Sequence, residues 1–269
     1  MRLAVVGDPV DHSLSPTIHT AALDLLGIVG TYTARNVDRA GLAAVIDELV
    51  AGDLDGVNVT MPHKKLAAQL VARVAATAAR TGAVNTITRV GGEAVGHNTD
   101  VAGVRLAWEW AGLPVDRPVV VMGSGGAAAA ALVAVAEMEV VGPVTVLARS
   151  AAAAAAMVDE VAVTAAVAPI GTEPAYGAVV VNATPLGMAG ETLPVSVERA
   201  GGLLDMAYAD RPTPAVAAAV AAGLPVADGI GVLLGQATAS FRLWTGRQPP
   251  LPVMRAAVEV ELARRRGDG

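Results

Sequence analysis

The sequence predicts an α/β fold, because short apolar runs alternate with helical periods along almost all of its 269 residues. Hydrophobic residues make up 54% of the chain but aromatic residues only 3%, so alanine and valine must provide most of the packing. This composition favours helices that lie close to a sheet of β-branched strands. A glycine-rich turn, Gly123-Ser-Gly-Gly126, lies between an apolar run and a helical period, as in parallel sheets that bind nucleotides.

Each expected strand is a short β-branched run that ends at turn residues, and each expected helix has apolar residues at helical spacing. In the first part of the chain, the expected strands are 3–6, 31–36, 55–60 and 83–88. The expected helices there are 16–26, 41–51, 63–70 and 101–111. Val90-Gly-Gly-Glu93 indicates a hairpin turn, in which the glycines supply positive φ angles.

The segment 112–118 indicates a loop before the next strand. The strands expected after it are 119–122, 144–148, 178–182, 203–206 and a short one near Val226. The helices expected after it are 127–135, 151–160, 214–222, 232–245 and 253–265. The run of alanine at 151–156 supports one of these, because alanine is the best helix former.

We expect two domains. A cluster of polar residues ends at Asp100, so we place a boundary near residue 101. The last two expected helices have no strand between them, and they could return to cover the first domain. The expected division is therefore a discontinuous first domain, 1–101 with 236–269, and a second domain, 102–235.

Charge and composition exclude several functions. The formal net charge is −6, and the basic residues are scattered apart from Arg264-Arg-Arg266, which suits a solvated helix end. A nucleic-acid-binding protein would show a basic patch and stacking aromatic residues, so we expect no nucleic acid partner. The chain has no cysteine, which excludes disulfides and cysteine nucleophiles. The histidines lack the spacing of metal ligands, so we expect no metal.

A membrane span and a signal peptide are not expected. The uncharged stretch 118–136 is nearly long enough to cross a bilayer, but the glycines at 123–126 interrupt it. A buried strand, a turn and a buried helix explain this stretch better. The chain starts directly with a strand-like run, and the lack of cysteine fits a reducing compartment, so we expect a cytoplasmic protein.

Ser13-Leu-Ser-Pro16 predicts the start of a helix, with Ser15 as the N-cap and Pro16 at the first helical position. One interpretation is that Ser15 only caps the helix. The other is that the hydroxyls of Ser13 and Ser15, together with free N–H groups at the positive helix end, bind a carboxylate.

Three polar segments indicate a site for a small polyhydroxy acid: Asn58-Val-Thr-Met-Pro-His-Lys64, Asn85 and Asn98-Thr-Asp100. Lys64 should lie at the opening of a helix, where a cation is unfavourable, and a lysine held there could act as a general acid or base. A surface lysine and an N-cap aspartate are the alternatives for Lys64 and Asp100. Because these segments recur at successive strand ends, where α/β sheets place ligands, we favour a site.

The segment 119–128 is a strand, a glycine turn and a helix that satisfies G-x-G-x-x-A. Its glycines would allow the backbone to approach a pyrophosphate at the helix N-terminus. The next expected strand ends in Arg149-Ser150. An NAD site usually has Asp or Glu at this position, whereas arginine favours the 2′-phosphate of NADP. A solvent-facing loop arginine is the alternative.

Taken together and in order, these segments resemble the shikimate dehydrogenase family over essentially the full length of the chain. The matching segments are Ser13–Pro16, Asn58–Lys64, Ala83–Thr86, Asn98–Asp100, Gly123–Ala127, Asn182–Met188, Asp205–Tyr208 and Asp228–Gln236. The resemblance implies NADP-dependent reduction of 3-dehydroshikimate to shikimate in aromatic amino-acid biosynthesis. It also implies two α/β domains, a substrate domain with a mainly parallel sheet and a Rossmann-like NADP-binding domain, with the catalytic cleft between them.

The resemblance also implies roles for individual residues. Lys64 and Asp100 would be the catalytic pair, which also binds the substrate. The other substrate residues would be Ser13, Ser15 and Tyr208 for the carboxylate, and Thr60, Asn85 and Gln236 for the rest, including ring hydroxyls. The cofactor residues would be Gly123, Ser124, Gly125, Gly126 and Ala127 at the pyrophosphate, Arg149 and Ser150 at the adenosine phosphate, and Thr184, Met206 and Gly229 on the nicotinamide side.

The chain departs from the family pattern beside the nucleotide site. The family often has Asn-Arg-Thr where this chain has Ala148-Arg149-Ser150, and the run 151–156 lacks the second basic residue that usually follows. Preference for NADP should therefore depend mainly on Arg149. Val101 stands where glycine is common, and we expect no effect on the chemistry. The alternatives are a relative that acts on quinate, with NADP or NAD, and a dinucleotide sensor without turnover. The sequence leaves the oligomeric state open, a homodimer included.

Overall fold

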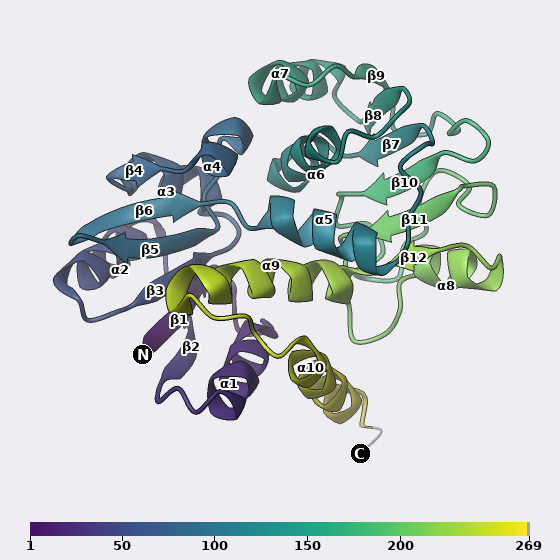
Figure 1. Ribbon diagram of the computed structural model, residues 1–269. Helices are drawn as coiled ribbons and strands as arrows, with labels where there is room; N and C mark the ends of the chain where they lie inside the picture. Colours follow the sequence, from purple (N-terminus) through teal and green to yellow (C-terminus); the bar gives the residue numbers. More distant parts are fainter. Residues whose placement is uncertain (268–269) are drawn as a thin grey trace. The chain divides into compact units, whose positions relative to one another are not determined.

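The computed structural model describes residues 1–267 and has the expected α/β class (Figure 1). The chain divides into two compact units, Met1–Thr99 with Gln236–Gly269, and Asp100–Gly235. Each unit contains its own six-stranded sheet. For comparison, the domains expected from the sequence were 1–101 with 236–269, and 102–235.

The sheet of the first unit is mixed, with the strand order β2-β1-β3-β5-β6-β4. Its strands are β1 (Arg2–Gly7), β2 (Thr31–Asn36), β3 (Gly56–Val59), β4 (Arg73–Val74), β5 (Thr86–Val90) and β6 (Glu93–His97). β1 runs parallel to β2 and β3, and β4 runs parallel to β6. Only β5 runs antiparallel to its neighbours, β3 and β6.

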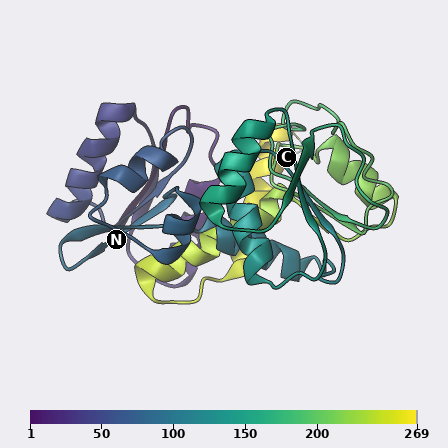
Figure 2. The same ribbon diagram turned by 90° about the horizontal axis from the view of Figure 1, so that it is seen from above.

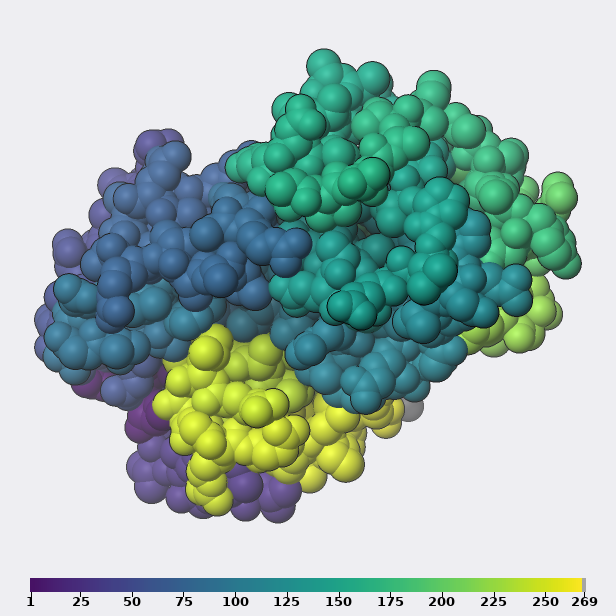
Figure 3. All heavy atoms as spheres, turned by 45° about the horizontal axis from the view of Figure 1, so that its top comes forward, coloured from purple at the N-terminus to yellow at the C-terminus, as the bar shows by residue number. Residues whose placement is uncertain are grey.

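Helices cover both faces of this sheet. The helices of the first unit are α1 (Ser15–Leu25), α2 (Arg39–Ala51), α3 (Lys64–Leu70), α4 (Ala76–Thr81), α10 (Leu251–Arg266) and the second part of α9 (Gly229–Thr245). Apolar residues of α2, α3 and α4 share one core with Ala4, Val6 and Val57 of the strands. α10 packs against α1, so an early and a late segment of the chain lie side by side, purple and yellow in Figure 3.

Local sequence signals fix the ends of the helices. Asp38 caps α2 by accepting a hydrogen bond from the backbone N–H of Gly41 at 2.7 Å. The same helix ends at Gly52, whose φ of +88° is a left-handed conformation that favours glycine. Gly56 of β3 lies directly under the Trp244 indole of α9, where an added Cβ would clash, so α9 can approach the strand closely.

The sheet of the second unit is entirely parallel, with the strand order β12-β11-β10-β7-β8-β9. Its strands are β7 (Val119–Met122), β8 (Val144–Ala148), β9 (Ala166–Pro169), β10 (Val179–Asn182), β11 (Gly202–Asp205) and β12 (Val226–Ala227). Counted from β7, this is the doubly wound order in which the topology reverses between the first and fourth strands. That switch point lies between β7 and β10.

Alternate residues of these strands face two separate helical layers. The helices of this unit are α5 (Asp100–Trp110), α6 (Gly126–Glu137), α7 (Ala151–Val161), α8 (Pro214–Ala221) and the first part of α9. Val119 and Val121 share a core with α5, α6 and α7. Val120 and Met122 share another with α8 and the segment before β11. Figure 2 shows α8 on the opposite side of the sheet from α6 and α7.

The structure adds β4, α4 and β9, all of which are short, to the expected elements. β6 follows the expected hairpin turn, where Val90 pairs with Glu93. Several boundaries differ from those expected. β5 begins at Thr86 and not at residue 83, because the N–H of Val84 donates to the carbonyl of Lys64 outside the sheet. Ser15 is not the N-cap of α1. Leu14 is the N-cap, without a capping side chain, and Ser15 and Pro16 are the first helical residues.

None of the helices in the described part of the chain is both long and apolar enough to cross a membrane. Within residues 1–267, no three His, Cys, Asp or Glu side chains lie together in a way that could hold a metal ion.

Candidate functional site

The polar segments of the first unit meet at one edge of its sheet. Thr60 follows the carboxyl end of β3, and its N–H donates to the carbonyl of Val6 in β1. Asn85 precedes β5, but because β5 is antiparallel, this start lies beside the carboxyl end of β3, where the N–H of Val59 donates to the Asn85 carbonyl. Asn98 follows β6 at the same edge. The edge therefore brings together side chains from three separate loops.

A buried hydrogen-bond network joins this edge to α9. The amide of Asn58 donates to the hydroxyls of Thr86 at 2.9 Å and Ser240 at 3.1 Å. The Thr86 hydroxyl lies 3.0 Å from those of both Thr99 and Ser240. The Asn85 side-chain oxygen accepts from the Thr99 N–H at 2.7 Å. With its oxygen fixed in this way, the Asn85 amide has one defined orientation.

Gln236 and Asn85, both expected to bind substrate, lie within reach of each other. The Asn85 amide nitrogen is 3.4 Å from the side-chain oxygen of Gln236. One turn further along α9, the Ser240 hydroxyl donates to the Gln236 carbonyl at 3.0 Å. The packing of α9 therefore decides where the Gln236 side chain stands relative to the edge of the sheet.

Tyr32 supports this edge from β2. Its hydroxyl donates to the Asn58 side-chain oxygen at 2.6 Å. The His19 ring stacks on the Tyr32 ring, with centroids 4.5 Å apart, and Trp244 tilts against both rings. Tyr32 thus connects the Asn58 side chain of the network to these aromatic rings. No periodic pattern in the sequence points to this residue.

His19 makes the stability of the first unit depend on pH. Its ring is buried, its Nδ1 has no hydrogen-bond partner within the described residues, and burial lowers its pKa to about 3. An unfolded histidine titrates near pH 6.5, so the unfolded chain binds the extra proton between these values. The contribution of neutral His19 to the free energy of unfolding is therefore fully present above about pH 6.5 and is lost as the pH falls toward 3.

We expect urea unfolding to show this loss between about pH 7 and pH 4, and we expect His19→Phe to reduce it. The phenyl ring keeps the stack on Tyr32 but does not titrate. The exposed His12 provides the control, since His12→Ala should leave the pH dependence as it is. If the free energy of unfolding of His19→Phe depends on pH as strongly as that of the unaltered protein, other groups cause the loss.

Ser13 and Ser15 lie in the turn that opens α1, and both are partly exposed. The Ser13 hydroxyl accepts from the Ser15 N–H at 3.2 Å. The Ser13 side chain thus fixes the turn. Both side chains belong to the start of the helix, although neither is its N-cap.

Lys64 is the first residue of α3 and is partly buried, whereas its neighbour Lys65 is exposed. Asp100, which is 6% exposed, is the first residue of α5. The expected positions of both residues at helix starts are therefore found. The positive end of the helix dipole favours the Asp100 carboxylate at the start of α5 and disfavours the Lys64 ammonium at the start of α3.

The glycine turn of the second unit lies at the switch point of the sheet. Gly123 has a φ of +117°, and a Cβ there would lie 3.0 Å from the Ala183 carbonyl that follows β10. Gly125 is the N-cap of α6 and provides no capping side chain. An added Cβ at Gly125 or Gly126 would meet no atom, so the backbone there is open to a ligand. Ser124 and Ala127 are partly exposed in the same turn.

Arg149 and Ser150 follow the carboxyl end of β8, next to β7 in the sheet. Both are exposed. Ser150 is the N-cap of α7, where its hydroxyl oxygen accepts from the Ala153 N–H at 3.2 Å. Arg149 makes no hydrogen bond or ion pair with any of the described residues. A free guanidinium beside a helix N-terminus is suited to a phosphate group.

Thr184, Met206 and Gly229 follow β10, β11 and β12, and Tyr208 lies in the loop after β11. Thr184, Met206, Tyr208 and Gly229 are placed on the second unit. An added Cβ on Gly229 would clash with the Ala207 carbonyl and would lie 2.9 Å from the Cβ of Tyr208. Only glycine allows α9 to start so close to this loop.

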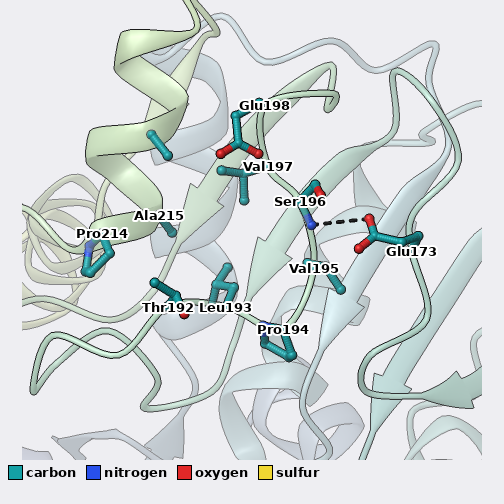
Figure 4. Close-up of a pocket in the computed structure, with 11 residues that line it drawn as sticks. Glu173, Thr192, Leu193, Pro194, Val195, Ser196, Val197, Glu198, Pro214 and Ala215 are labelled. Carbon is teal, nitrogen blue, oxygen red and sulfur yellow. Dashed lines mark hydrogen bonds between the residues drawn. The ribbon is translucent and has the colours of Figure 1, made fainter.

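A surface pocket of about 340 Å³ also lies in the second unit, lined by Glu173, the segment 192–198 and the start of α8 (Figure 4). Glu173 accepts a hydrogen bond from the Ser196 N–H at 3.2 Å across its edge. None of the predicted site residues lines it. We assign this pocket no part in the function.

Reasoning from the sequence missed the residues that hold the site together. Thr86, Thr99 and Ser240 form the centre of the network in the first unit. Ser240 follows Gln236 by four residues, and this helical spacing could have indicated it. Asn58 and Asp205 stand within segments on which the resemblance depends, but their hydrogen bonds needed the structure.

Comparisons with known proteins identify the family. Residues 5–87 match the family profile "Shikimate dehydrogenase substrate binding domain", and residues 229–259 match "Shikimate 5'-dehydrogenase C-terminal domain". A protein of Citrifermentans bemidjiense named shikimate dehydrogenase (NADP(+)) is 37% identical, over 96% of this chain and 94% of its own length.

Solved structures show the same similarity. Shikimate 5-dehydrogenase from Thermus thermophilus, in complex with NADP(H) and shikimate, has a TM-score of 0.86 and 35% identity, covering 96% of this chain and 98% of its own. Shikimate 5-dehydrogenase from Listeria monocytogenes, in complex with shikimate and NAD, has a TM-score of 0.83 and 26% identity, covering 96% of each chain. The chain described here belongs to the shikimate dehydrogenase family.

Proposed function

We propose that this protein catalyses the reversible NADPH-dependent reduction of 3-dehydroshikimate to shikimate, a step of the shikimate pathway that supplies chorismate and the aromatic amino acids. One observation carries the proposal. Nearly every residue expected to act on substrate or cofactor adjoins the edge of its own sheet where parallel strands end, which is where α/β sheets bind ligands. Gln236 is the exception, and its side chain reaches Asn85 at such an edge.

The second unit fits NADP. The open backbone at Gly125 and Gly126 and the uncapped start of α6 suit a pyrophosphate. Arg149 would bind the 2′-phosphate, with the Ser150 hydroxyl donating to it. Thr184, Met206 and Gly229 would lie on the nicotinamide side. When bound, NADPH supplies the hydride for the C3 carbonyl carbon of the substrate.

The first unit fits a small acid with several hydroxyls. We propose that Ser13 and Ser15 bind the substrate carboxylate, together with Tyr208 of the second unit. Thr60, Asn85 and Gln236 would bind the remaining polar groups of the ring. The fixed orientation of the Asn85 amide supports this, because a preorganised donor loses little entropy when it binds a ligand.

Lys64 and Asp100 would handle the proton. As negative charge develops on the C3 oxygen, the Lys64 ammonium would stabilise it and donate a proton to it. Asp100 would hold Lys64 and a substrate hydroxyl in position. In the reverse direction, the same pair would remove the proton from the hydroxyl of shikimate.

The test is the change in nicotinamide absorbance when the purified protein meets shikimate and NADP. Parallel reactions would combine NAD with shikimate, and quinate with each cofactor. We expect rapid turnover with shikimate and NADP. Turnover mainly with quinate or with NAD would indicate a relative of broader specificity, such as one that acts on quinate. Binding of NADP without any turnover would indicate a dinucleotide sensor.

We further propose that the protein is cytoplasmic, and we retain a homodimer as the oligomeric state to be tested. The biosynthetic role of its relatives supports the location. Cell fractionation tests the location, and sedimentation of the purified protein tests the oligomeric state.

A further inference from the structure

A buried carboxylate lies beneath the proposed nicotinamide side of the second unit, and the proposed chemistry does not use it. Asp205 ends β11 and Asn182 ends β10, where the two residues are partners in the register of the sheet. Both are fully buried, with 0% of each residue exposed. The Asn182 amide donates to Asp205 Oδ1 at 2.8 Å. Because a buried carboxylate is costly unless it is hydrogen-bonded, its partners indicate what it holds in place.

The Oδ1 side of Asp205 supports two loops that carry proposed cofactor residues. Asn182 is held by Asp205, and its own oxygen accepts from Thr184, from the N–H at 3.1 Å and from the hydroxyl at 2.6 Å. Asp205 Oδ1 also accepts from the Ala207 N–H at 3.0 Å, while the Met206 N–H donates to the Asn182 carbonyl at 2.9 Å. Thr184 and Met206 are therefore positioned by the same pair.

The Oδ2 side of Asp205 contacts a different part of the unit. The Thr213 hydroxyl donates to Asp205 Oδ2 at 2.6 Å, and its oxygen accepts from the Val216 N–H at 3.2 Å. Thr213 is the N-cap of α8. This side therefore anchors a helix and reaches no residue to which we assign a cofactor contact.

We propose that Asp205 is a positioning residue for the nicotinamide half of NADP, acting through Asn182 on Thr184 and directly on the loop of Met206. The inference rests on the proposed function for the identity of the ligand. It goes further by separating the two oxygens of one carboxylate, since Oδ1 serves the cofactor loops and Oδ2 serves the fold.

Asp205→Ala removes both sides. It leaves the Ala207 N–H and one of the two N–H groups of the Asn182 amide without an acceptor, since the other can still donate to the Leu186 carbonyl. We expect affinity for NADP to fall about tenfold or more, because the loops of Thr184 and Met206 lose this support and must be ordered when the cofactor binds. Turnover should fall as well, because a displaced nicotinamide is poorly oriented for transfer. Affinity for adenosine 2′,5′-bisphosphate, which lacks the nicotinamide half, should stay close to that of the unaltered protein.

Two variants separate positioning from stability. In Asp205→Asn, the amide oxygen can still accept on the Oδ1 side while the amide nitrogen donates to Thr213, whose hydroxyl can accept in turn. We expect this variant to restore most NADP binding. Thr213→Val removes only the Oδ2 contact and the cap of α8, so it should lower Tm and leave NADP binding unchanged. If Asp205→Ala does not fold, Asn182→Ala tests the same Oδ1 link from the other strand.

The readout is calorimetric titration of each variant with NADP and with adenosine 2′,5′-bisphosphate, beside its thermal unfolding. Binding of NADP by the unaltered protein shows that the ligand is correct, independently of turnover. Unchanged NADP affinity in a folded Asp205→Ala or Asn182→Ala overturns the proposal. Equal loss of both ligands, or the same loss in Thr213→Val, also overturns it, because the carboxylate would then only support the fold.

Discussion

Lys64→Ala should lower the turnover number with shikimate and NADP by about 10²- to 10⁴-fold, which is the usual range for the loss of a general acid or base. The reason is that Lys64 is the proposed donor of the proton and stabiliser of the developing charge. Its effect should be smaller on the KM for shikimate than on kcat, because the stabilised charge exists only in the transition state. Steady-state kinetics in both directions measure the two constants.

The neighbouring lysine is a matched control for this experiment. Lys65 is the next residue of the same helix and is exposed, so Lys65→Ala changes the same charge without reaching the proposed site. We expect this variant to keep its turnover. Near-normal turnover in Lys64→Ala would show that Lys64 takes no part in the mechanism. An equal loss of turnover in both variants would show that the substitutions act by disturbing the start of α3.

Arg149→Ala should weaken NADP binding by about 10- to 100-fold while NAD binding changes little, since hydrogen bonds to charged groups contribute roughly 1.5–3 kcal/mol. The guanidinium makes no hydrogen bond or ion pair with the described residues, so its removal should not disturb the fold. α7, which starts directly after Ser150, carries no basic residue that could take over. Titration with each cofactor in turn measures the two affinities.

Arg117→Ala supplies the control for this charge change. Arg117 lies before the amino end of β7, and its guanidinium pairs with Asp116, whereas Arg149 follows the carboxyl end of the neighbouring strand β8. We expect unchanged affinity for both cofactors in this variant. If Arg149→Ala instead loses NAD and NADP binding equally, the arginine contacts a part that the two cofactors share.

The strand, turn and helix of the proposed nucleotide site could be predicted from the sequence because their signals are local. They follow one another along the short segment 119–128, and a helix start of this kind is suited to a phosphate by its own geometry. Arg149 follows its strand directly, so its position needed only the strand boundary. In both cases the chain connectivity itself brings the functional groups together.

The substrate half was predictable only in part. Lys64 at a helix start and Asp100 at another followed from turn residues and apolar periods. The position of Asn85 did not, because it depends on β5 running antiparallel within a mainly parallel sheet. The short elements β4, α4 and β9 were missed because so few residues give too little periodicity to recognise.

Local spacing and turn chemistry were enough to predict the α/β class and the order of most elements. The pairing of the buried polar groups, in contrast, depends on how the elements pack. Asn58 donates to Ser240 across 182 residues, and Asn182 donates to Asp205 across 23. Such pairs form because a buried polar group must find a partner wherever the packed elements bring one, and no local pattern specifies that partner.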